Sequence, residues 1–257
     1  MARVRNLMDG EGRLLLLLAA MMLVNSLAMQ ISYVASVSGF LEADGLDLIW
    51  IVWTLSYLAF LVITALQTLI IDRFNRVGLV RFLLIAFASA FLAIWAALTF
   101  GAFDGVAYAA LYIVAELQWM VFPAFYWVLA NDVTSMAQAK RLFPRVASAG
   151  FAGSLIGLLL ASLAPALFSR LGVGLEHVLL VNVVLYLAII AAPGRLRPNA
   201  ATEESRRPRA ARAEGFRKAL TGRVEFVRNV TAIRLLTLSL LALMVVDTIL
   251  EFHFLAV

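Results

Sequence analysis

The sequence LLLLLAAMMLVNSLAMQISYVASV, residues 14–37, contains no charged side chain and decides the class of fold. A single helix needs roughly 20 consecutive, mostly apolar residues to cross the core of a bilayer. This segment is long enough, and it lacks the small-residue cleavage site in a polar region that would mark a cleaved signal peptide. It therefore predicts a first membrane-spanning helix.

Six further apolar runs follow the first one. Hydrophobic residues make up 63% of the 257 residues and charged residues 14%, against about 45–50% and about 25% in soluble domains. So much apolar surface predicts an all-α fold, a polytopic membrane helical bundle. The predicted spans are Leu14–Val37, Leu48–Ile71, Leu79–Phe100, Val106–Leu129, Val146–Phe168, Val178–Ala192 and Leu235–Val257.

The connection between the sixth and seventh runs is much longer than the others, and it is rich in arginine and proline. We therefore predict three parts: a six-helix bundle over residues 1–194, a basic linker over 195–234, and the first helix of a second bundle over 235–257. Because the last run is apolar up to Val257, we expect the second bundle to continue beyond it. A protein that ends naturally after seven spans is the alternative.

Basic residues predict the orientation of the bundle, because cytoplasmic loops of membrane proteins are enriched in lysine and arginine. If the N-terminus is cytoplasmic, every one of the 21 lysines and arginines except Arg170 falls on the cytoplasmic side. We therefore expect a multi-pass protein of the cell (inner) membrane with a cytoplasmic N-terminus. The same distribution argues against nucleic acid as a partner and for the lipid bilayer, with the basic linker facing anionic inner-leaflet lipid.

The sequence carries no sign of catalytic chemistry. It has no cysteine, and its two histidines lie far apart, which excludes thiolate and histidine-rich metal sites. No nucleophile–base pair is recognisable either. We therefore expect no enzyme activity, no cofactor and no metal.

Polar and aromatic residues at helical spacing mark candidate sites within the apolar runs. Glu116 lies near the middle of the fourth run, where a carboxylate is costly and usually faces a cavity or a partner. Single polar residues in such runs more often join helices together, as do the small residues Gly150, Gly153 and Gly157. The other candidates for substrate contact are aromatic or amide side chains, suited to a planar ligand: Tyr112, Trp119 and Tyr126 on the fourth run, Gln30 and Tyr33 on the first, and Tyr57 on the second.

Two acidic residues of the seventh run, Asp247 and Glu251, are one helical turn apart. Two carboxylates on one face within the membrane favour the binding of a proton or a cation. We therefore add both residues to the candidate coupling site, with protons as candidate partners. The alternative is that one of them pairs with an arginine elsewhere.

The segment Ile71-Asp72-Arg73-Phe74-Asn75-Arg76 is similar to a loop signature of major facilitator transporters, in which an acidic residue is followed by spaced arginines. An acidic residue at the C-terminus of a helix is unfavourable unless it has a partner. Asp72, Arg73 and Arg76 are therefore candidates for a latch between conformations. The alternative is that the arginines only determine topology.

A longer resemblance lies between residues 112 and 157. The strings Ala115-Glu116-Leu117, Phe125-Tyr126-Trp127-Val128-Leu129-Ala130-Asn131-Asp132-Val133-Thr134 and Ala139-Lys140-Arg141-Leu142-Phe143-Pro144 resemble those of the nucleotide transporter family, the ATP/ADP translocases. The resemblance implies a major facilitator fold, in which two six-helix halves surround a site at the midplane. It also adds Asn131, Asp132, Lys140 and Arg141 to the gating candidates. Glu251 falls where the family places a glutamate in helix seven.

The resemblance leaves the substrate open. Members that exchange nucleotides carry a lysine in helix one and another basic residue soon after the helix-seven glutamate, whereas this chain has no lysine or arginine between Arg13 and Arg73 or after Arg234. A polyphosphate needs compensating cations. We therefore expect secondary active transport of a small solute, of which a nucleotide is one candidate. The alternative function is a non-transporting sensor or anchor fused to soluble regulatory domains.

Overall fold

The structure, a computed structural model, describes residues 11–43, 48–70, 74–101, 104–172 and 174–196. Beyond these it describes residue 231 and short pieces between 234 and 250. The chain divides into two compact units, Met1–Ser205 and Arg206–Val257. In the second unit the described positions are helical, and their apolar side chains, such as Leu235 and Ile249, are exposed.

The described part of the first unit consists of helices without strands. Six are α-helices, joined by short connections, and two are short 3₁₀ helices. Their bounds are α1 Glu11–Ala43, α2 Ile49–Ile70, α3 Arg76–Thr99, α4 Asp104–Val133, α5 Met136–Leu171, η2 Leu175–His177, α6 Val178–Ile189 and η3 Pro193–Arg195.

Five segments of the described chain are long and apolar enough to cross a membrane, which indicates a membrane-embedded protein. These are Glu11–Ala43, Arg76–Thr99, Gly105–Val133, Met136–Phe168 and Val178–Arg195. α2, 22 residues long, is apolar over Ile49–Thr64 as well. The all-helical class is thereby confirmed for the described residues, which include five helical segments that could span a membrane.

Some helices are longer than the apolar runs that predict them. α5 begins at Met136, whereas the apolar run begins at Val146, because alanine, glutamine, lysine and arginine in residues 136–145 are good helix formers. α4 and α5 also continue through Pro123 and Pro144. An apolar run indicates which residues lipid covers, but backbone hydrogen bonds can continue the helix beyond that run.

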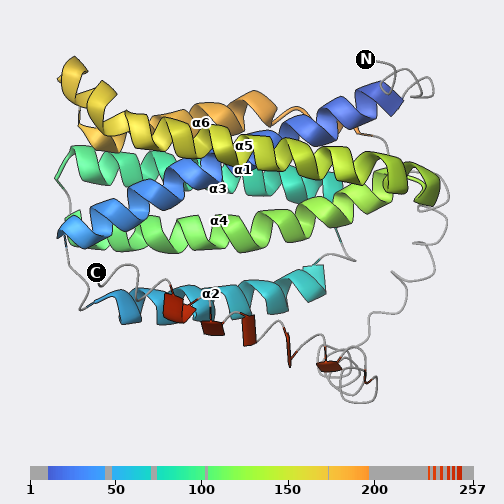
Figure 1. The fold of residues 1–257 in the computed structure, drawn as a ribbon, viewed down its shortest axis with the longest axis horizontal. Coiled ribbons are helices and arrows are strands. Elements are labelled where there is room, and N and C mark those ends of the chain that lie inside the picture. The colour runs from blue at the N-terminus through green and yellow to red at the C-terminus, as the bar shows by residue number, and fades with distance from the viewer. Residues whose placement is uncertain are drawn as a thin grey trace. The chain divides into compact units, whose positions relative to one another are not determined.

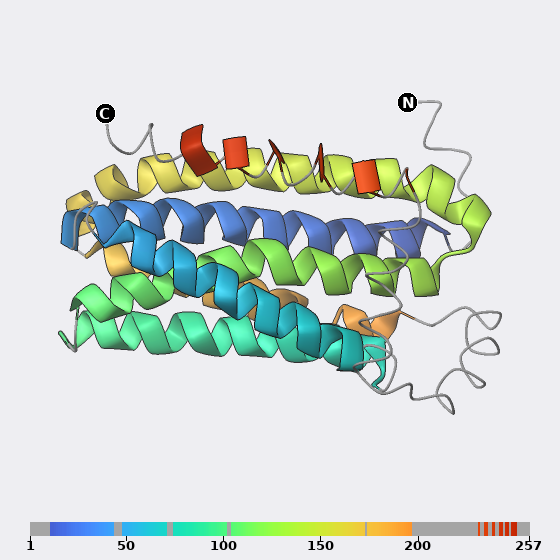
Figure 2. The same ribbon diagram turned by 90° about the horizontal axis from the view of Figure 1, so that it is seen from below.

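The helices of the first unit run back and forth along a common direction (Figures 1 and 2). α1 lies at the centre and packs most extensively against α5, and it also contacts α4 and α6. α3 packs against α4 and α6, whereas α2 packs against α4. α1, α3 and α5 begin at the end of the bundle where α2, α4 and α6 finish. The polar residues that flank these helix ends therefore lie together at that end.

Three glycines allow α5 to approach α1 closely. A Cβ atom added at Gly153 would lie 2.2 Å from the carbonyl oxygen of Leu23, and one at Gly157 would lie 2.5 Å from that of Leu27. Gly150 faces the side chain of Met22 at 2.9 Å. The predicted role of these glycines in helix packing is confirmed, because no other side chain leaves room for the α1 backbone.

Candidate functional site

Aromatic side chains join α2 to α4. Trp53 Nε1 of α2 donates a hydrogen bond to Tyr112 Oη of α4 at 2.8 Å. Both side chains are buried, and Phe40 of α1 meets Tyr112 edge-on, with ring centroids 6.1 Å apart. The predicted candidate Tyr112 is therefore held in an aromatic cluster of three helices, in which the indole N–H has a partner.

The predicted face of α4 is covered unevenly. Tyr112 is buried near α2, and Tyr126 is buried and donates from Oη to the carbonyl oxygen of Leu18 in α1 at 2.8 Å. Between them, Glu116 is half-buried and Trp119 is 52% exposed. Neighbouring helices thus cover α4 at both ends of this face and leave a less covered stretch, Glu116 and Trp119. This stretch is the candidate site.

The remaining predicted substrate residues lie on other helices. Tyr57 of α2 is exposed, and Gln30 and Tyr33 of α1 are half-buried. Gln30 lies at the contact with α5, because a Cβ atom at Gly157 would come within 2.9 Å of Gln30 Cβ. The side chain of Gln30 therefore begins at the interface between α1 and α5.

A buried hydrogen-bond chain connects α1, α4 and α6. Ser32 Oγ of α1 donates to Gln118 Oε1 of α4 at 2.5 Å, and Gln118 Nε2 donates to Tyr186 Oη of α6. Tyr186 Oη in turn donates to Asn25 Oδ1 of α1 at 3.0 Å. On α6, Asn182 Nδ2 donates to the carbonyl oxygen of Ala28 at 3.0 Å.

This chain of hydrogen bonds stabilises the bundle from its interior. Ser32, Gln118, Asn182 and Tyr186 are each 0% exposed, and the ring of Tyr186 stacks on Phe91 of α3 at 6.3 Å. Buried groups that satisfy one another hold their helices in one arrangement. Our sequence analysis missed this network. The available signal was a glutamine and an asparagine inside apolar runs.

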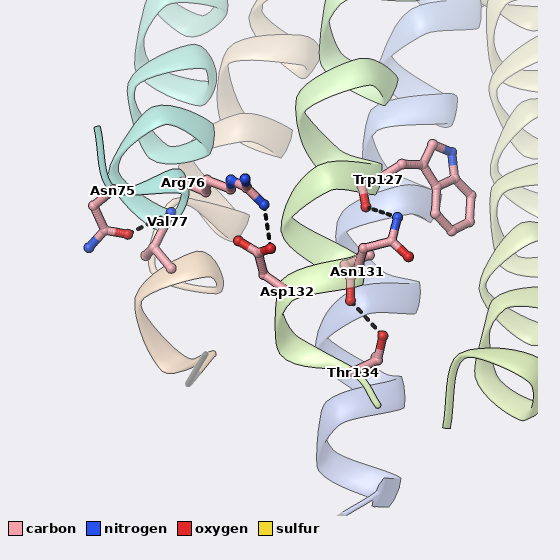
Figure 3. Close-up of polar contacts among 8 residues, drawn as sticks. Asn75, Arg76, Val77, Trp127, Asn131, Asp132 and Thr134 are labelled. Carbon is pink, nitrogen blue, oxygen red and sulfur yellow. Dashed lines mark hydrogen bonds and ion pairs between the residues drawn. The ribbon is translucent and has the colours of Figure 1, made fainter. Parts of the chain in front are cut away.

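One end of the bundle is basic, and we call it the basic end; its lysines and arginines in the described first unit are Arg13, Arg76, Arg81, Lys140, Arg141, Arg145 and Arg195. Arg76, in the first turn of α3, forms an ion pair with Asp132 in the last turn of α4 (Figure 3). The side chain of Asp132 is 7% exposed and that of Arg76 is 19% exposed. The pair therefore fastens α3 to α4 in a largely dry environment.

Neighbouring residues position this ion pair. Asn75 caps α3 by accepting a hydrogen bond from the backbone N–H of Val77 at 3.0 Å, which fixes the turn that carries Arg76. The predicted gating residue Asn131 is exposed. It donates to the carbonyl oxygen of Trp127, within its own helix, at 2.9 Å (Figure 3).

A second ion pair at the basic end joins α1 to α5. Arg141 Nη2 lies 2.6 Å from Glu11 Oε1. Glu11 is only 3% exposed, whereas Lys140 beside Arg141 is exposed. Of the two basic residues predicted here, Arg141 joins α5 to α1 and Lys140 is exposed. Sequence reasoning missed Glu11, whose signal is an acidic residue in the first turn of an apolar helix.

Four predicted site residues, Asp72, Arg73, Asp247 and Glu251, lie outside the described residues. Among the residues that the structure does describe, no group of histidine, aspartate and glutamate side chains could hold a metal ion. Comparisons of the chain with protein-family models, with curated proteins and with solved structures gave no match.

Proposed function

We propose that this membrane protein is a secondary active transporter of a small solute, of the ATP/ADP translocase-like branch of the major facilitator superfamily. The observation that carries the proposal is the half-buried carboxylate of Glu116 in the membrane-spanning helix α4. A carboxylate at that depth costs several kcal/mol unless it faces water, a proton or a cationic partner. A transport pathway supplies such surroundings.

The uncovered Trp119 beside Glu116 supports the same proposal. An exposed tryptophan offers a flat apolar surface for stacking, and Tyr57 of α2 is exposed as well. An aromatic surface with one carboxylate suits a planar or cationic solute. It suits a polyphosphate poorly, since the α4 stretch offers no positive charge.

The contacts at the basic end also agree with transport. The strings that resemble the nucleotide transporters contain Tyr126, Asp132 and Arg141, and each of the three contacts another helix: Tyr126 and Arg141 contact α1, and Asp132 contacts α3. Ion pairs between helix ends can form and break as a transporter opens and closes. We therefore propose that the basic end is the gate of this half.

Removing the charge of Glu116 is expected to lower transport at least about tenfold, which corresponds to about 1.4 kcal/mol. Glu116→Gln keeps the size and most of the hydrogen bonding of the side chain, so a role in packing alone would survive it. The measurement is uptake into liposomes that contain the complete protein, with and without a pH gradient, using labelled nucleotides beside neutral and cationic solutes.

Glu42→Gln is the matched control, because Glu42 is an exposed glutamate near the other end of α1, and it should leave uptake unchanged. Exchange of ATP for ADP that Glu116→Gln does not affect would contradict the proposed site. Absence of uptake for all solutes would favour a non-transporting membrane module.

The orientation is a further part of the proposal: the basic end faces the cytoplasm. Because the chain has no cysteine, single cysteines can be labelled without background. We expect Ala43→Cys, at the end of α1 away from the basic end, to react with an impermeant thiol reagent in intact cells. Arg145→Cys should react only after permeabilisation. The reverse pattern would invert the orientation.

A further inference from the structure

A cavity of about 660 Å³ lies at the basic end, lined by Arg13, Leu14, Leu17, Val133, Gly194, Arg195 and Leu196. Its walls come from the first turns of α1, the end of α4 and the 3₁₀ helix η3 after α6. The volume is in the range of sites that bind small molecules, roughly 300–1,000 Å³. Three segments distant in the sequence therefore form one site-sized hollow.

The described residues that line the cavity carry charge of one sign. Two of them are arginines and none is acidic. Two described acidic residues lie next to the cavity walls in the sequence, and both form ion pairs elsewhere: Glu11 pairs with Arg141, and Asp132 pairs with Arg76. Within the part of the chain that the structure describes, Arg13 and Arg195 form no ion pair. Both are exposed, so their guanidinium groups can accept an anion.

The two arginines stand at the level where the apolar part of the bundle ends. Arg13 directly precedes the run of leucines that opens α1, and Arg195 ends the segment Val178–Arg195 that can cross the membrane. This is the depth of lipid headgroups. Leu14 and Leu17 add an apolar wall below the charges.

From these observations we propose that the cavity binds a phosphate ester, held by Arg13 and Arg195, and that its natural source is the headgroup of an anionic phospholipid. Guanidinium groups form paired, charge-assisted hydrogen bonds with phosphate oxygens. The leucine wall fits the glycerol and upper acyl chain of a lipid, and a soluble phosphate ester would leave it unused. A lipid bound there would tie the start of α1 to the end of α6.

The test uses the purified complete protein in detergent, titrated with phosphatidylglycerol, phosphatidylcholine or inorganic phosphate and read out by native mass spectrometry. We expect phosphatidylglycerol to bind more tightly than phosphatidylcholine. In the double variant Arg13→Gln with Arg195→Gln, its affinity should fall roughly tenfold or more, because both charge-assisted contacts are lost. Arg13→Lys with Arg195→Lys keeps the charge and should restore part of it.

The matched control is Arg81→Gln with Arg145→Gln, which removes the same charge from exposed arginines of the basic end outside the cavity. It should leave the affinity for phosphatidylglycerol unchanged. An equal loss in both double variants, or no loss in the cavity variant, would overturn the proposal. Inorganic phosphate that binds as tightly as the lipid, with the same dependence on the variants, would support the phosphate site and assign it to a soluble ligand.

Discussion

Replacing Gly153 with alanine is expected to lower the thermal stability of the bundle more than any other glycine-to-alanine change in α5. The new Cβ atom would lie 2.2 Å from the carbonyl oxygen of Leu23 and 3.0 Å from its Cα atom. Backbone atoms cannot rotate away as a side chain can, so α5 must move away from α1. Forced separation of well-packed elements costs about 1–3 kcal/mol, and leucine at this position should cost more.

The other glycines give a graded set of controls. Gly157→Ala meets the carbonyl oxygen of Leu27 at 2.5 Å and should be the next most destabilising of the α5 changes, whereas Gly150→Ala meets the side chains of Met22 at 2.9 Å and Ser26 at 3.3 Å and no backbone atom among its nearest neighbours. Gly12 has no atom within 4 Å of its added Cβ, so Gly12→Ala should be neutral or should stabilise by up to about 1 kcal/mol through helix propensity. Melting temperatures in detergent measure the series. Equal effects of Gly153→Ala and Gly12→Ala would contradict close packing of α1 and α5.

The spans were predictable from the sequence because lipid imposes one simple requirement, a long apolar run. That requirement does not specify where a helix ends. The first turn of α1, with Glu11 buried against Arg141, and the first turns of α5 lie outside the apolar runs. Their helical state depends on capping, propensity and partners on other helices.

The candidate site was predictable only where a single residue indicated it without knowledge of its neighbours. A carboxylate in an apolar run marks Glu116 by itself, because its cost does not depend on its neighbours. Spacing on α4 placed Tyr112, Trp119 and Tyr126 on one face, but spacing does not reveal which neighbour covers that face at each level. α2 covers Tyr112 and α1 covers Tyr126, which leaves Trp119 exposed.

Pairings across the bundle were the least predictable feature. Asp132 and Arg76 are 56 positions apart, and the sequence offered several other arginines as partners for either helix end. Gln118 similarly meets Ser32 and Tyr186 only because α1 packs against both α4 and α6. Which polar residues meet is a property of helix packing, and helix packing follows from shape complementarity such as that of Gly153 and Gly157.

The ion pair between Arg76 and Asp132 is expected to give the largest effect of a single charge removal in the described part of the bundle. Asp132→Asn removes one charged partner of the largely buried Arg76 guanidinium, and removal of one member of a buried pair costs about 3–5 kcal/mol. Arg145→Gln, which removes an exposed charge of the same end, should change the free energy of unfolding by less than about 0.5 kcal/mol.

A double-mutant cycle isolates the pair, because Arg76 and Asp132 each have further polar contacts that a single substitution also removes. Unfolding in mixed micelles of Asp132→Asn, Arg76→Gln and the double variant should give a coupling energy of at least about 1 kcal/mol. Additive losses would mean that the two charges do not stabilise one another.

The exchanged pair, Arg76→Asp with Asp132→Arg, should recover only part of the stability. It places a positive charge at the C-terminus of α4 and a negative charge at the N-terminus of α3, which is favourable for both helix dipoles. The two side chains differ in length, however, so the exchanged pair does not fit the same space. If the basic end is a gate, the same single variants should also increase the reactivity of a cysteine at position 80, because Val80, one helical turn after Arg76, is buried and becomes accessible when α3 and α4 separate.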